Sequence, residues 1–83
     1  MNRVLVVDDD GGMRAALEAR FLRRGWQVET ASNAVEALEK FRRGMHPLIV
    51  TDIRMPGRTA DEDGLFVMRS ARALAPHLSL IHI

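Results

Sequence analysis

Two short apolar runs, each ending in a carboxylate, constrain the fold of this chain more than any other feature. Residues 4–7 (Val-Leu-Val-Val) lead into Asp8, Asp9 and Asp10, and Leu48–Thr51 leads into Asp52. Apolar or β-branched runs of this length are too short for helices and are typical of buried strands. If the two strands lie side by side in a parallel sheet, their carboxyl ends meet at one edge, where open α/β sheets bind ligands. The sequence therefore predicts a cluster of carboxylates at that edge.

Stretches with helical spacing of apolar residues separate the strand-like runs. We expect strands over residues 3–8, 26–31, 48–51 and 78–83, and helices over residues 13–24, 33–44 and 65–75. Gly11 and Gly12 are interpreted as a turn before the first helix. Gly25 and Gly44 are expected to end the first two helices, because glycine is the usual residue at a helix C-terminus. Asn33 and Glu36 have the spacing of a capping box at the start of the second helix.

This alternation predicts one α/β domain over residues 1–83 with a doubly wound parallel sheet. The first and third strands are fully apolar and belong in the centre, whereas the second alternates and belongs at an edge. The expected strand order is 2-1-3-4, with three helices. The fourth strand is mostly apolar yet has no successor. We therefore expect the fold to be incomplete at its C-terminus, and we expect the exposed edge of the fourth strand to favour association or low stability.

Composition excludes several classes of function. The net charge of +1 gives no argument for nucleic-acid binding, so we expect none by this domain directly. The absence of cysteine excludes disulfides and thiolate metal sites and suits a cytoplasmic protein. No apolar run approaches the length of about 18 residues that a membrane span requires, so we expect no membrane association. None of the histidines, His46 included, is paired with a carboxylate or histidine at ligand spacing, and we give His46 no role.

The acidic residues suit a hard cation. Asp9 and Asp52, with Asp8 behind them, would supply oxygen ligands alone, which Mg²⁺ prefers and Mn²⁺ accepts. An aspartate beside such a cation can also act as a nucleophile and form an acyl phosphate. Acidic residues after a strand can instead be charges at a helix N-terminus, as Asp10 could be. Spacing alone leaves both interpretations open.

Three motifs, in order along the chain, resemble the receiver domain of two-component response regulators. They are Val6-Val7-Asp8-Asp9-Asp10, Thr51-Asp52-Ile53-Arg54-Met55-Pro56-Gly57 and Asp63-Gly64-Leu65. The resemblance implies the flavodoxin-like fold. The sequence of the second motif is similar to the corresponding sequence of receivers attached to sigma-54-dependent or other DNA-binding output domains. It therefore implies a transcriptional output domain, which this chain does not contain.

The same resemblance implies roles for four residues. Asp52 would be the phosphoacceptor and would take a phosphoryl group from a sensor histidine kinase. Asp9 would bind Mg²⁺ directly, Asp8 would help through water, and Asp52 and the main-chain carbonyl of Arg54 would complete the protein ligands. The Arg54 side chain would influence the lifetime of the acyl phosphate. Such a protein is a signalling module whose only chemistry is its own phosphorylation and dephosphorylation, and not a metabolic enzyme.

The chain also departs from the family. Residues 58–62 make the loop after the second motif longer than usual. The family's switch hydroxyl would follow Ile83, and its fifth strand, the lysine on that strand and its last two helices are absent. The chain thus resembles the first two-thirds of a receiver. We expect it to be incomplete relative to its parent protein, or to be stabilised by a partner or a swapped element.

Two alternatives remain. A phosphohydrolase of the haloacid dehalogenase type would use Asp8 as nucleophile and Asp10 as general acid/base. It would also need a later lysine, and the one lysine, Lys40, lies in the middle of an amphipathic helix. The other alternative is an interaction module that keeps the fold without phosphorylation. The presence of Asp8, Asp9 and Asp52 argues against that alternative.

Overall fold

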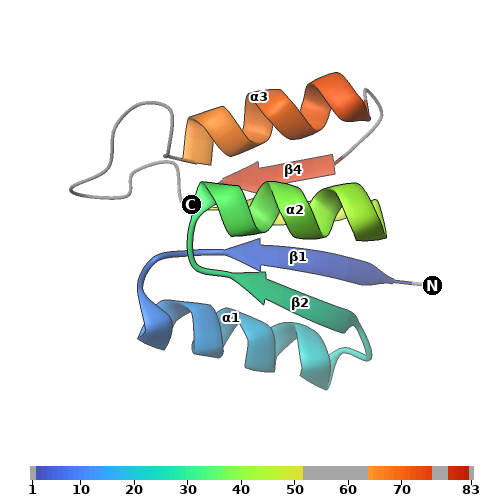
Figure 1. The fold of residues 1–83 in the computed structure, drawn as a ribbon. Coiled ribbons are helices and arrows are strands. Elements are labelled where there is room, and N and C mark those ends of the chain that lie inside the picture. The colour runs from blue at the N-terminus through green and yellow to red at the C-terminus, as the bar shows by residue number, and fades with distance from the viewer. Residues whose placement is uncertain (1, 52–63, 76–78, 83) are drawn as a thin grey trace.

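A computed structural model describes residues 2–51, 64–75 and 79–82 of the chain. Strands and helices alternate in the order β1 (Arg3–Val7), α1 (Gly11–Arg23), β2 (Gln27–Ala31), α2 (Ala34–Gly44), β3 (Leu48–Thr51), α3 (Gly64–Leu74) and β4 (Ser79–His82) (Figure 1). The predicted alternation is confirmed, and the boundaries agree with the expected ones to within two residues. No helix in the described part of the chain has the length and apolar character needed to cross a membrane.

The four strands form one parallel sheet in the order β2-β1-β3-β4, which confirms the predicted order. The register places Val7 at the end of β1 opposite Ala31 of β2 and Thr51 of β3. Helix α1 covers one face of the sheet, and α2 and α3 cover the other (Figure 1). Strand β2, whose side chains alternate, lies at an edge as predicted. These are the features of a doubly wound, flavodoxin-like fold.

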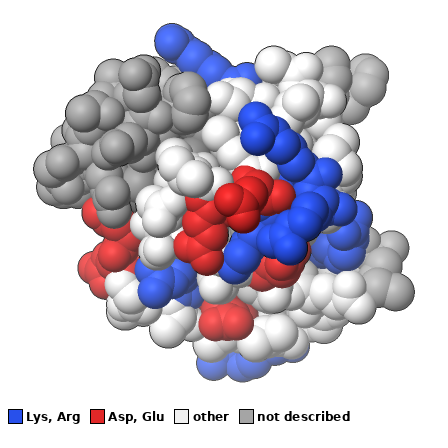
Figure 2. Space-filling model, in the orientation of Figure 1, with Lys and Arg blue, Asp and Glu red and all other residues white. Residues whose placement is uncertain are grey.

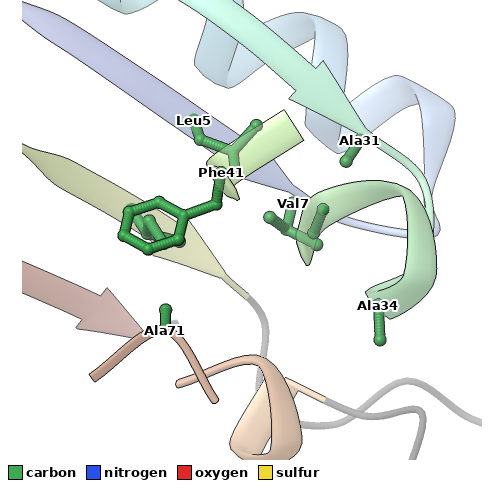
Figure 3. Close-up of a cluster of buried hydrophobic side chains, with 8 residues drawn as sticks. Leu5, Val7, Ala31, Ala34, Phe41 and Ala71 are labelled. Atoms are coloured by element: carbon green, nitrogen blue, oxygen red, sulfur yellow. The ribbon is translucent and has the colours of Figure 1, made fainter. Parts of the chain in front are cut away.

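Strand β1 is buried on both faces because it has a strand on either side and helices above and below. Leu5 and Val7 belong to the cluster beneath α2 and α3, whereas Val4 and Val6 belong to the cluster beneath α1. Phe41 of α2 is the largest fully buried side chain. Figure 3 shows Phe41 and Ala71, from α2 and α3, on the same side of the sheet as Leu5 and Val7. The central run of apolar residues therefore fixes the core of the domain.

Helix α1 ends in a Schellman motif, as Gly25 predicted. Gly25 has φ of +84°, and its N–H donates to the carbonyl of Leu22 at 3.0 Å. The N–H of Trp26 donates to the carbonyl of Phe21 at 3.1 Å, and the two rings meet edge to face with centroids 5.3 Å apart. Trp26 is therefore a packing residue at the start of β2.

Helix α2 ends at Gly44 as predicted, but its cap differs from that of α1 because Gly44 is not the residue in the left-handed conformation. Gly44 is the last helical residue, and Met45 takes the left-handed conformation with φ of +46°. A Cβ on Gly44 would lie 2.6 Å from Cε1 of His46, so glycine leaves room for that ring. His46 is 2% exposed, and its Nε2 lies 2.6 Å from Oε1 of Glu29. The role that the sequence did not reveal for His46 is thus to join α2 to β2.

The predicted capping box is present at the start of α2. The N–H of Glu36 donates to Oδ1 of Asn33 at 2.8 Å, and the N–H of Ser32 donates to Oε1 of Glu36 at 2.8 Å. Lys40 donates to the carbonyl of Thr30 at 2.6 Å and lies 3.1 Å from Oε2 of Glu36. The Ser32 N–H, followed by Lys40, lowers the pKa of Glu36. These contacts fasten α2 to the end of β2.

The core predicts how the chain responds to truncated side chains. Phe41→Ala should lower the free energy of unfolding by about 3–5 kcal/mol, because it removes a buried ring and leaves a cavity. Ile49→Val, also in the core, should cost about 0.5–1.5 kcal/mol and keeps the test measurable if Phe41→Ala does not fold. Val35→Ala in α2 is the control, because Val35 is 69% exposed. Urea denaturation followed by circular dichroism measures all three, and equal effects of Phe41→Ala and Val35→Ala would contradict this core.

The lowered pKa of Glu36 predicts a pH-dependent contribution to stability. Folding depresses the pKa below the ordinary value of 4.5, so the contribution is fully present above that value. It is lost as the pH falls through the folded-state pKa. The difference in unfolding free energy between wild type and Glu36→Gln should therefore shrink on acidification. Denaturation at a series of pH values tests this, with Glu39→Gln on the same helix as the control for removing a charge. A difference that stays constant with pH would contradict the prediction.

Candidate functional site

The carboxyl ends of β1, β2 and β3 form one edge from which the chain enters its loops (Figure 1). Val7 lies opposite Ala31 of β2 and Thr51 of β3. In the sequence these three residues are followed by Asp8, Ser32 and Asp52. Asp8 and Asp9 lie where the sequence predicted them. Asp52 and Arg54 lie outside the described residues, so their predicted roles are not tested by the geometry.

Asp8 is a buried carboxylate, with 2% of its surface exposed. Its Oδ1 accepts a hydrogen bond from the N–H of Asp10 at 2.9 Å. Its own N–H donates to the carbonyl of Ala31 at 3.1 Å, which extends the pairing of β1 with β2 by one residue. Burying a carboxylate is costly unless hydrogen bonds or opposite charges compensate it. The adjacent Asp9 is partly exposed. The pair therefore places one carboxylate beneath the surface and one at it.

Asp10 has a structural role. It is the N-cap of α1, and its Oδ1 accepts hydrogen bonds from the N–H groups of Gly12 and Met13 at 2.9 and 3.2 Å. The predicted turn at Gly11 and Gly12 is therefore the first turn of the helix. This cap supplies partners for amides that a helix cannot satisfy itself, which offsets the low helix propensity of the glycines. Of the two interpretations of Asp10, the helix-terminal one is confirmed.

Arg14 reaches back to the acidic turn, a contact that the sequence analysis missed. Its Nη1 donates to the main-chain carbonyl of Asp8 at 2.7 Å, and its own N–H donates to the carbonyl of Asp10 at 2.9 Å. The contact was missed because the sequence predicted a helix beginning at Met13 and not at Gly11. A helix beginning at Gly11, however, brings residue 14 one turn into the helix and within reach of the turn before it.

The donor chemistry at this edge fits a hard divalent cation. Asp8 and Asp9 offer carboxylate oxygens, and Mg²⁺ is usually bound through one or two carboxylates and several waters. Within the described ranges, no group of three or more His, Asp or Glu residues could hold a metal ion. A complete site would therefore draw a further ligand from residues beyond those ranges, as the motif around Asp52 predicts.

The charged side chains are unevenly distributed over the molecule. In Figure 2 acidic side chains lie at the left edge and across the centre of the view, and much of the basic surface lies towards the right. The basic residues include those in the last turns of α1 and α2, namely Arg20, Arg23, Arg42 and Arg43. Cations at helix C-termini complement the helix dipole.

Comparison with known proteins gives the family to which this domain is similar. The family model described as "Response regulator receiver domain" matches residues 4–83. Response regulator MprA of Mycobacterium leprae is 37% identical over 95% of this chain and 33% of its own length. The C4-dicarboxylate transport transcriptional regulatory protein DctD of Rhizobium meliloti is 35% identical over 94% of this chain and 16% of its own length. The chain therefore spans a third or less of these curated relatives.

Solved structures show the same fold. The response regulator TrrA of Thermotoga maritima, crystallised with Mg(2+)-BeF, superposes with a TM-score of 0.84 at 36% identity, over 96% of this chain and 66% of that chain. A second structure holds TrrA in complex with the histidine kinase ThkA and also superposes with a TM-score of 0.84, over 99% of this chain and 67% of that chain. With the sheet order, the acidic edge and the family match in agreement, the chain belongs to the response regulator receiver domains of two-component signalling.

Proposed function

We propose that this chain accepts a phosphoryl group on Asp52 from a sensor histidine kinase, with the help of Mg²⁺, and thereby controls a transcriptional output domain. One observation carries the proposal. The buried Asp8 and its neighbour Asp9 follow β1, and the register of β1 with β3 pairs Val7 with Thr51, the residue that precedes Asp52 in the sequence. The Mg(2+)-BeF and histidine kinase complexes of TrrA support the cation and the partner, and the name of DctD supports the output.

The reaction in this proposal is a transfer between two side chains. A carboxylate oxygen of Asp52 attacks the phosphorus atom carried by the kinase histidine. The bond between phosphorus and the histidine nitrogen breaks, and its electron pair stays on that nitrogen. Mg²⁺ supplies positive charge that neutralises the phosphoryl oxygens. Phosphoryl transfer depends largely on positioning and electrostatics, so the protein contributes mainly the placement of its ligands.

The ligands have separate tasks in this scheme. Asp9, at the surface, would bind the cation directly, and Asp8, beneath it, would act through water. The carboxylate of Asp52 and the main-chain carbonyl of Arg54 would complete the protein ligands. The difference in exposure between Asp8 and Asp9 supports this division, because the deeper carboxylate is the one fixed by a main-chain hydrogen bond.

The hydrolase alternative loses its support. It requires Asp10 as a general acid/base, whereas the Asp10 carboxylate accepts two hydrogen bonds as the cap of α1. It also requires Asp8 as an attacking nucleophile, whereas Asp8 is 2% exposed. The family match favours a receiver over this class of enzyme. The interaction module without phosphorylation remains distinct from our proposal and is one outcome of the test below.

Phosphorylation of Asp52 is the first prediction. Incubation with acetyl phosphate and Mg²⁺ should add one phosphoryl group, read by intact mass as an increase of about 80 Da. Asp52→Asn and chelation of Mg²⁺ should each abolish the adduct, whereas Glu39→Gln, which removes an exposed carboxylate of α2, should keep it. A phosphoryl group on Asp8 would favour the hydrolase. If wild type stays unmodified, the proposal is wrong and the chain is an interaction module.

The role of Asp10 gives a second prediction. Asp10→Ser should retain the helix cap and leave both stability and Asp52 phosphorylation near wild type. Asp10→Ala should lower the free energy of unfolding by about 1 kcal/mol, because the N–H groups of Gly12 and Met13 lose their acceptor. Denaturation and the acetyl phosphate assay measure the two effects. Loss of phosphorylation in a stable Asp10→Ser variant would show that Asp10 takes part in the chemistry.

A further inference from the structure

We infer that Arg14 is a positioning residue, which holds the acidic turn in the shape that binds the cation. The inference rests on the proposed function, because it concerns the same site. Arg14 contacts the turn at both ends. Its N–H donates to the carbonyl of Asp10 at 2.9 Å, and its Nη1 donates to the carbonyl of Asp8 at 2.7 Å. Asp9, the residue proposed to bind the cation directly, lies between these two anchored carbonyls.

The side chain of Arg14 runs back along the first turn of α1. A Cβ built on Gly11 would lie 3.6 Å from Nη2 of Arg14, an ordinary contact distance, so the guanidinium lies beside the Gly11 backbone. Its hydrogen bond to Asp8 is charge-assisted and therefore stronger than a bond between neutral groups. Arg14 is partly buried, so water competes less with this bond than it would at a fully exposed position.

Fixing the Asp8 carbonyl also fixes the peptide plane that joins Asp8 to Asp9, because the peptide group is planar. The carboxylate of Asp8 in turn accepts a hydrogen bond from the N–H of Asp10. The backbone is therefore restrained on both sides of Asp9, at the carbonyl of Asp8 and at the N–H of Asp10. Mg²⁺ demands near-ideal octahedral geometry, so rigid placement of the first ligand favours binding. Residues that orient the ligands of a metal in this way change its affinity when they are lost.

Arg14 also acts through its charge. It brings a cation beside three consecutive aspartates, and a guanidinium has no lone pair with which to bind a metal. In the described part of the chain, the Arg14 side chain contacts the acidic turn through the main-chain carbonyl of Asp8. Removing the charge alone would strengthen cation binding, whereas removing the restraint would weaken it. We expect the loss of the restraint to dominate when Arg14 is replaced. The sign of the change in Mg²⁺ affinity shows which of the two effects is larger.

The test compares Mg²⁺ affinity in matched variants by titration calorimetry. Arg14→Met removes the charge and the guanidinium donors, and it keeps an unbranched apolar side chain and the main-chain N–H that donates to Asp10. It should weaken Mg²⁺ binding by about 10-fold or more, the usual cost of losing a group that orients a metal ligand. Arg14→Lys keeps the charge and one donor and should stay within a few-fold of wild type. Arg20→Met, at an exposed arginine of the same helix, should bind Mg²⁺ like wild type.

A second comparison separates positioning from a general loss of stability. Ile49→Val destabilises the core without touching the acidic turn, and it should leave Mg²⁺ affinity unchanged. In the acetyl phosphate assay, Arg14→Met should need more Mg²⁺ for half its maximal rate and reach a similar rate at saturation. A merely structural role for Arg14 would not produce this split.

The outcomes distinguish a failure of the Arg14 inference from a failure of the proposed function. If wild type binds Mg²⁺ and is phosphorylated, but Arg14→Met binds Mg²⁺ equally or more tightly, the inference is overturned and the proposed function stands. An equal loss of affinity in Ile49→Val also overturns it. If wild type neither binds Mg²⁺ nor becomes phosphorylated, the proposed function and the inference both fall. A loss confined to Arg14→Met, and largely restored in Arg14→Lys, supports the inference.

Discussion

The burial of β1 on every side is the constraint on which the rest of this domain depends. A parallel strand bonds to each of its edges, and helices cover both of its faces. Val4, Leu5, Val6 and Val7 are at most 1% exposed as a result. The residue that directly follows a strand in this position is buried as well. Asp8 is buried because it is the next residue, and its chemistry is therefore a direct consequence of where the core lies.

A charge delivered to such a place needs compensating contacts, and the turn after β1 supplies them by dividing tasks among neighbouring residues. Asp10 binds the free amides of α1, and its own N–H binds the Asp8 carboxylate. Arg14 binds the Asp8 carbonyl from the first turn of the helix. Side chains alike in the sequence thus differ in role. One aspartate is a helix cap, one is a buried acceptor, and Asp9 lies partly exposed between them.

Sequence reasoning succeeded where a pattern records burial or a local bond, and it failed where contacts join distant residues. The apolar run of β1 and the alternation of β2 predicted their places in the sheet, and Gly25 predicted a cap formed entirely within its own turn. Gly44 ends its helix as expected, but its lack of a side chain leaves room for the ring of His46. The bond of His46 to Glu29 spans 17 residues and leaves no periodic signal. At the candidate site, the roles that the motif gives Asp8 and Asp9 stay predictions, and the contact of Arg14 became visible only once the helix was known to begin at Gly11.

The register of β1 against β3 has a consequence for how such a chain can change in evolution. One residue inserted into either strand would move the carboxylate beyond it by about 3.3 Å and turn it to the opposite face of the sheet. Added loop residues cost little, because closure entropy rises only slowly with length. Lineages should therefore tolerate changes in length in the loops beyond the strands and reject them within the two strands. The lengths and the register of the strands thus set the spacing between the carboxylates, whereas the loops beyond the strands are free to diverge.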